Sequence, residues 1–108
     1  MREAVYARAN GRCECGCNRR LNVSADRNLF SDLSRELDHF FGKGKAPATV
    51  ETCWVLSRAC HRAKTENKPG AQTWLLRFIV HCQLHGYATA AHQARMKLEW
   101  ILAKRGVA

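Results

Sequence analysis

The sequence predicts a small α+β domain, in which a two-stranded hairpin and a helix follow a Cys-rich knuckle and pack against C-terminal helices. Three observations predict it. Residues 50–56 are rich in β-branched and aromatic side chains, as strands are. Three of the six cysteines fall within residues 13–17, and apolar residues in the last third recur at helical spacing. We expect one domain over 1–108, with the knuckle and central elements in 8–68 and a helical support in 71–108.

The N-terminal third is predicted as a short helix, a knuckle and a loop. Residues 2–9 (REAVYARA) form the helix, which Asn10 and the glycine after it end because both residues tolerate a left-handed backbone. Residues 12–20 (RCECGCNRR) form the knuckle, with Gly16 at a tight turn. Residues 22–34 are polar and mixed, which indicates a loop.

The hairpin is predicted from two strand-like segments on either side of a basic loop. Residues 35–41 (RELDHFF) and 50–56 (VETCWVL) are the strands, and 42–49 (GKGKAPAT) is the Gly-rich loop. A helix should begin at Ser57 or within the next three residues and run to about Asn67, because a Pro-Gly pair follows.

Two amphipathic helices are predicted in the last third, over 71–85 and 87–105, with Gly86 as a C-cap between them. Each should turn one apolar face to the core. The residues of these two faces are Trp74, Leu75, Phe78, Ile79 and Cys82, and then Tyr87, Ala91, Ala94, Leu98 and Ile101.

The composition argues against a disordered or membrane-spanning chain. Hydrophobic residues make up 46% and charged residues 25% of the sequence, close to a globular average. No apolar stretch reaches membrane-spanning length. The net charge of +9 indicates an acidic partner, most often nucleic acid, with a device for solubility as the alternative.

The cysteines indicate a metal site rather than disulfides, because the sequence starts without the apolar run of a secretion signal. We therefore expect a reducing compartment, the cytoplasm, with free thiols as the alternative to a metal. Cys82 and His85 also have a ligand-like gap, but Cys82 lies on an apolar helix face and is expected in the core. Three histidines are expected at the surface or at helix ends: His81, His85 and His92.

The predicted hairpin and helix carry residues suited to metal binding and proton transfer. Asp38 and His39 are neighbours on the first strand, and His61 lies at the start of the helix. Neighbouring side chains leave a strand on opposite faces, but where the strand ends both can address one metal and its water. A hairpin with Asp-His, followed by a helix with His, brings the three groups together.

In this segment the chain resembles the HNH endonucleases, also called ββα-metal nucleases. The matching residues are Asp38-His39 and Cys60-His61, the latter followed by a Lys-Thr pair. The N-terminal GRCECGC is similar to the zinc knuckle that many of these enzymes carry. The resemblance covers residues 8–68, implies a ββα-metal finger there, and depends on the order of several weak motifs.

The resemblance implies a metal-dependent endonuclease that hydrolyses phosphodiester bonds of double-stranded DNA, leaving 5′-phosphate and 3′-hydroxyl ends. His39 would be the general base, because imidazole exchanges protons near neutral pH. Asp38 and His61 would hold one divalent cation, Mg²⁺ or Mn²⁺, and Ni²⁺ or Co²⁺ would also fit. No small-molecule cofactor and no membrane is expected.

Two residues depart from the family pattern. Thr52 stands where the family has an Asn that braces the loop and so aims the base histidine. A threonine can make one such hydrogen bond but not two, and Thr52 is alternatively an ordinary strand residue. Ser57 stands where the family often has the first cysteine of Cys-x-x-Cys-His, so that one zinc thiolate is missing.

The knuckle compensates with a third cysteine. A structural Zn²⁺ takes four ligands, and thiolates serve well. Cys53 is the alternative fourth ligand if one knuckle cysteine does not bind. The expected zinc ligands are Cys13, Cys15, Cys17 and Cys60.

The basic residues around the motifs are expected to hold DNA phosphates, which gives affinity with little sequence selection. Solvated loop charges are the alternative for the two loop lysines. A monomer would nick and a homodimer could cut both strands, in a bacterial or phage-infected cell. The rival function is a non-catalytic, zinc-stabilised nucleic-acid-binding module derived from an HNH fold. The expected DNA-binding residues are Lys43, Lys45, Arg58, Arg62 and Lys64.

Overall fold

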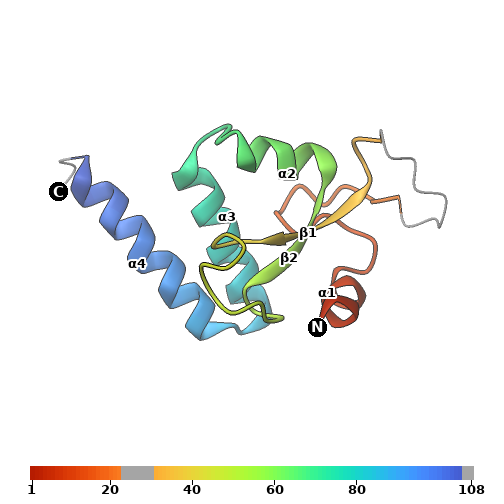
Figure 1. Cartoon of the computed structure of the whole chain (residues 1–108), viewed down its shortest axis with the longest axis horizontal. Coiled ribbons are helices and arrows are strands. Elements are labelled where there is room, and N and C mark those ends of the chain that lie inside the picture. The colour runs from red at the N-terminus through yellow and green to blue at the C-terminus, as the bar shows by residue number, and fades with distance from the viewer. Residues whose placement is uncertain (23–30, 106–108) are drawn as a thin grey trace.

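The computed structural model describes residues 1–22 and 31–105 as an α+β chain (Figure 1). The loop predicted over 22–34 lies outside the described residues between 23 and 30. Asn10 ends the first helix in the left-handed conformation, as predicted. The elements in order are α1 (Arg2–Ala9), β1 (Arg35–His39), β2 (Cys53–Ser57), α2 (Arg58–Thr65), α3 (Ala71–His85) and α4 (Ala88–Lys104).

The two strands form an antiparallel hairpin and are shorter than predicted. β1 ends at His39 because the chain turns there, with the Gly42 N–H donating to the His39 carbonyl at 2.8 Å. β2 begins only at Cys53, because the preceding residues form a turn in which the Cys53 N–H donates to the Thr49 carbonyl at 3.1 Å. These turns set the residue at which β1 ends and the residue at which β2 begins.

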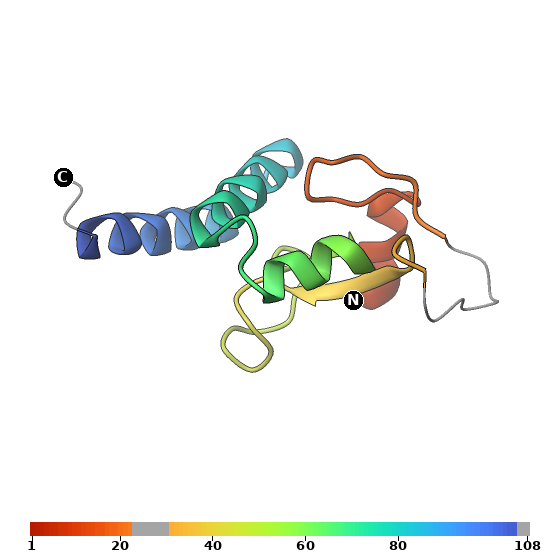
Figure 2. The same cartoon turned by 90° about the horizontal axis from the view of Figure 1, so that it is seen from above.

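Helix α2 packs on both strands of the hairpin, as Figure 2 shows from above. Ser57 is its N-cap: the Ser57 hydroxyl accepts a hydrogen bond from the Cys60 N–H at 3.0 Å. The helix ends at Thr65, two residues before the predicted end at Asn67. Its first turn therefore lies directly after β2 and brings Cys60 and His61 next to the sheet.

The core is an aromatic cluster that joins the hairpin to α3. The Phe78 ring stacks on Phe40, with ring centroids 3.9 Å apart, and meets Trp54 edge-on at 5.2 Å. All five predicted core residues of α3 are buried, Cys82 among them. His81 was expected at the surface, but it is only 3% exposed because its helix turns it onto Trp54.

Helix α4 packs on α3 and extends away from the hairpin along the longest axis of the molecule (Figures 1 and 2). The predicted face of α4 meets the core, with Ala91 and Ala94 buried and Leu98 and Ile101 partly buried. Gly86 caps α3 in the left-handed conformation, as predicted. Among the described residues, none of the helices has the length and apolar character needed to cross a membrane.

Phe78→Ala is expected to lower the free energy of unfolding by about 3–5 kcal/mol, because it removes a fully buried ring and leaves a cavity. Urea unfolding followed by tryptophan fluorescence measures the loss. Leu84→Ala, on the same helix but 79% exposed, is the matched control and should change stability by less than about 0.5 kcal/mol. Equal effects of the two changes would contradict this description of the core.

Candidate functional site

Four cysteine thiols from two distant parts of the chain converge. Three come from the knuckle and one from α2, and their Sγ atoms all lie within 4.8 Å of one another. The Cys15 sulfur lies 3.5 Å from that of Cys13 and 3.7 Å from that of Cys60. The Cys17 sulfur lies 3.9 Å from that of Cys60.

These separations match those around a single ion. Four sulfurs at tetrahedral corners, each about 2.3 Å from Zn²⁺, lie about 3.8 Å apart. The predicted set of four cysteines can therefore bind a metal ion such as zinc. Cys53 is fully buried on β2 outside this group, so Cys60 and not Cys53 supplies the fourth thiol.

The thiols of the knuckle share hydrogen bonds. The hydrogen bond with Cys15 lowers the pKa of Cys13, and the same contact raises the pKa of Cys15. The Ser57 N–H donates to the Cys13 sulfur at 3.3 Å. Ser57 thus contributes its backbone to the cluster and its hydroxyl to the helix cap, and a cysteine at this position is not needed for a four-thiol set.

A second polar cluster lies between β1 and α2. The Asp38 Oδ1 atom lies 3.3 Å from His61 Nε2, and the other ring nitrogen, Nδ1, lies 3.1 Å from Glu36 Oε1. Glu36 and Asp38 are two residues apart on β1, so they share the face of the strand that α2 covers. The imidazole is thus held between two carboxylates from the same strand.

Asp38 is the most enclosed member of this second cluster, at 5% exposed. Trp54, its partner across the hairpin, donates from Nε1 to Asp38 Oδ2 at 2.7 Å. Lys64 Nζ lies 3.3 Å from the same oxygen. Burial alone would raise the pKa of Asp38, but the hydrogen bond with His61 and the Lys64 charge outweigh it and lower that pKa.

The charge state of His61 follows from the same contacts. The hydrogen bond to Asp38 raises the pKa of His61, burial opposes the rise, and Glu36 adds to it. Without a cation between them, His61 therefore holds a proton against Asp38 more readily than a free histidine does. A metal ion that binds to these two residues has to replace that proton.

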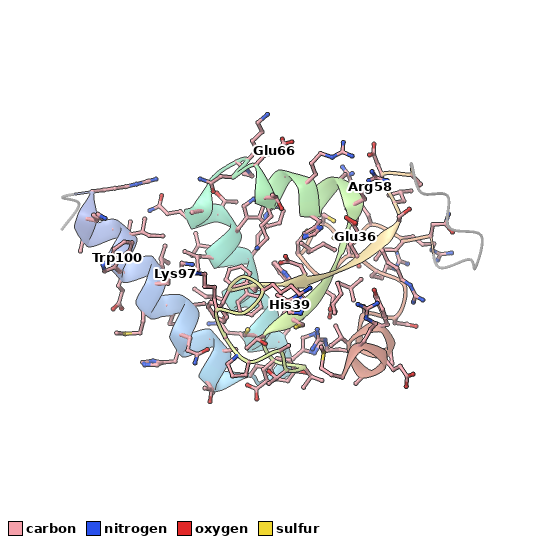
Figure 3. All side chains as sticks on the ribbon, in the orientation of Figure 1. Glu36, His39, Arg58, Glu66, Lys97 and Trp100 are labelled. Carbon is pink, nitrogen blue, oxygen red and sulfur yellow. The ribbon has the colours of Figure 1, made fainter. Side chains whose placement is uncertain are left out.

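His39 follows Asp38 in the chain but does not join this cluster. It is the last residue of β1 and half-buried, and its side chain makes no hydrogen bond or ion pair with residues 1–22 or 31–105. Figure 3 shows His39 and Glu36 at the two ends of the strand. The structure thus brings Asp38 and His61 together and leaves the imidazole of His39 available.

Thr52 braces the loop that follows His39. Its hydroxyl donates to the Pro47 carbonyl at 2.8 Å and accepts from the Thr49 N–H at 3.0 Å. Its carbonyl accepts from the Phe40 N–H at 3.0 Å, next to the end of β1. The expectation of a single hydrogen bond is wrong, because the hydroxyl both donates and accepts within the same turn.

The five basic residues expected to bind DNA differ in exposure: three are exposed and two are half-buried. Lys43 and Lys45 are exposed on the loop between the strands, and Arg62 is exposed on α2. Arg58, at the start of α2, is half-buried and lies at the Glu36 end of the hairpin (Figure 3). Lys64 lies inside the second cluster, with its ammonium group directed at Asp38 and the Phe40 ring.

The sequence did not point to Glu36 or Trp54 as partners of the site. Glu36 could have been found from the alternation of a strand, because it lies two residues before Asp38. Trp54 could not, because its hydrogen bond depends on the register that pairs it with Asp38. Glu36 contacts His61 and Trp54 donates to Asp38, so both contact side chains that the sequence did single out.

No protein-family model, no curated protein and no solved structure matches this chain. The cysteine cluster suits a metal ion such as zinc. The cluster around Asp38 brings two carboxylates, an imidazole and an ammonium group together.

Proposed function

We propose that this chain is a metal-dependent endonuclease of the HNH type that hydrolyses phosphodiester bonds of double-stranded DNA. The observation that carries the proposal is the contact between Asp38 and His61, which Glu36 orients, with His39 next to Asp38 in the chain. In this interpretation β1, β2 and α2 form a ββα-metal finger, and the four cysteines hold a structural zinc ion. The products would be a 5′-phosphate and a 3′-hydroxyl.

The pair fits a divalent cation because its two facing atoms are both suitable ligands. When His61 donates from Nδ1 to Glu36, its Nε2 lone pair faces Asp38 Oδ1 at 3.3 Å. An oxygen and a nitrogen at neighbouring corners of an octahedron, each about 2.0–2.1 Å from Mg²⁺, lie about 2.9 Å apart, so the ion would draw the two atoms together by about 0.4 Å. A carboxylate on the second ring nitrogen is the usual partner of a metal-bound histidine.

Each residue of the site would have its own role in hydrolysis. Asp38 and His61 would hold Mg²⁺ or Mn²⁺, with Ni²⁺ or Co²⁺ as substitutes, and the bound cation would stabilise negative charge at the phosphate. His39 would take the proton of the attacking water, since its imidazole has no competing partner in the described residues. Thr52 would hold the loop after His39 in place.

The charge distribution supports a nucleic-acid partner. The chain carries a net charge of +9. Lys43 and Lys45 extend from the exposed loop that follows His39, and Arg58 and Arg62 lie on α2. Cations on both sides of the reacting groups would bind the phosphates that flank the cut, with affinity that falls as salt is raised.

The second candidate is a non-catalytic, zinc-stabilised nucleic-acid-binding module. The observation that favours it is the ion pair of Lys64 with Asp38, together with the Trp54 hydrogen bond. These contacts satisfy the buried carboxylate of Asp38 without any metal ion. In such a module, Asp38 and His61 would only stabilise the contact of α2 with the hairpin.

A plasmid-nicking assay distinguishes the two. The zinc-loaded protein is expected to convert supercoiled DNA to the nicked form in Mg²⁺ or Mn²⁺ and to stop in EDTA, while the metal content of the cysteine cluster is measured in parallel. DNA binding without nicking in any of these metals would support the module. If the protein neither binds nor nicks DNA, both candidates are excluded.

A further inference from the structure

Glu14, His81 and His85 form a third cluster of ligand atoms, on the side of the knuckle that faces α3. Glu14 Oε2 lies 3.8 Å from His81 Nδ1 and 3.9 Å from His85 Nε2. The three ligand atoms all lie within 4.8 Å of one another. The two histidines are four residues apart on one helix, the spacing that places two side chains on the same face.

The contacts of this third cluster are too long for hydrogen bonds, which rarely exceed about 3.2 Å for nitrogen and oxygen. His81 is 3% exposed, and its Nε2 has no hydrogen-bond partner among the described residues. Its other ring nitrogen, Nδ1, is the atom that faces Glu14. Hydrogen bonding within the protein therefore leaves this histidine incompletely satisfied.

Arg8 fixes the direction of the Glu14 carboxylate. The Arg8 guanidinium donates to both carboxylate oxygens at 2.8 Å, and the Val55 N–H donates to Oε1 at 2.9 Å. Oε1 thus has two donors and Oε2 has one, so Oε2 keeps a lone pair that can bind a metal ion. Carboxylates that bind metals are commonly held by such outer hydrogen bonds.

We propose that Glu14, His81 and His85 bind a divalent transition-metal ion, with Zn²⁺ the best match. Two imidazole nitrogens and one carboxylate oxygen are a ligand set that zinc accepts, with the fourth position left to water. Ligand atoms around zinc lie about 3.3 Å apart, so an ion would shorten the two contacts of Glu14 by about 0.5 Å. The Arg8 charge next to the site weakens binding, so we expect lower affinity than at the four thiols.

Such an ion would join the knuckle to the C-terminal helices. Glu14 lies between two of the cluster cysteines, whereas His81 and His85 belong to α3. The site shares no residue with Asp38 and His61. It is therefore independent of the proposed endonuclease activity and would act as a second clamp on the fold.

The test uses the full chain without an affinity tag, first loaded with one equivalent of Zn²⁺, and titrates further Zn²⁺ by calorimetry. About one further equivalent is expected, and the ¹⁵N resonances of His81 and His85 should shift while those of His92 do not. His85→Ala should weaken this second binding by at least about tenfold. His85 is an exposed residue, so this variant should fold.

His92→Ala, at an exposed position on α4, is the matched control and should bind the second equivalent like the wild type. The proposal is overturned if the wild type takes up no second equivalent, or if His85→Ala binds it with unchanged affinity. Protection of the four thiols from alkylation, followed in the same samples, shows separately that the first equivalent occupies the cysteines.

Discussion

Cys60→Ala is expected to cost the protein its structural metal and most of its stability. Four sulfurs from the knuckle and α2 converge on one point, and removing Cys60 takes away the thiol that links the two segments. Structural zinc binding contributes roughly 10–16 kcal/mol of apparent free energy in small domains, so a three-thiol site should lower the free energy of unfolding by more than about 4 kcal/mol. Elemental analysis and thermal unfolding measure both effects.

Cys53→Ala is the matched control for this change. Cys53 is also a free cysteine, fully buried on β2, but it lies outside the four-thiol cluster. The variant should retain about one zinc ion at the four thiols and lose only the packing of one sulfur, about 1 kcal/mol. If Cys53→Ala loses the metal and Cys60→Ala keeps it, the assignment of the fourth thiol is wrong.

His39→Ala is expected to reduce DNA nicking by about 10²–10⁴-fold, the usual contribution of a positioned general base. The change removes an imidazole that has no hydrogen bond or ion pair in the described residues, so the fold should not depend on it. DNA affinity should stay within about twofold of the wild type, since affinity comes from the cations that contact phosphates. Single-turnover nicking in Mn²⁺ and a filter-binding assay measure the two quantities.

His92→Ala serves as the control for loss of a histidine, because His92 is exposed on α4, outside the proposed site. It should nick at the wild-type rate. A His39→Ala protein that nicks as fast as the wild type would refute the role of His39 as the base. Loss of DNA binding together with nicking would instead point to a role in binding.

The local elements of the fold could be predicted because each depends on neighbours in the chain. The helix over 71–85 was predicted with the bounds it has, since its apolar spacing and its capping glycine are both local features. The strand bounds were less accurate. The two larger errors lie next to the loop between the strands, where the turns at His39 and Thr49 use backbone groups that a longer ladder would need. The second strand also ends one residue later than predicted, at Ser57.

The cysteine cluster was predicted from the three neighbouring cysteines of the knuckle and from the family resemblance around Cys60, and the geometry of the four sulfurs agrees. The partners of Asp38 and His61 were not predicted. Glu36 was overlooked, Trp54 depends on strand register, and Lys64 points into the site although it was expected to face DNA. Each of these contacts depends on how α2 lies across the hairpin.

Composition and periodicity act over a few residues, so they were enough to predict the order of the elements, the apolar faces of the last two helices and the residues able to bind metal. Which of those residues meet depends on how the elements pack. The sulfur contact of Cys15 with Cys60 spans 45 residues, and the contact of His61 with Glu36 spans 25. Such pairs depend on side-chain packing between elements, and this packing also buried His81 against Trp54 and brought it to Glu14.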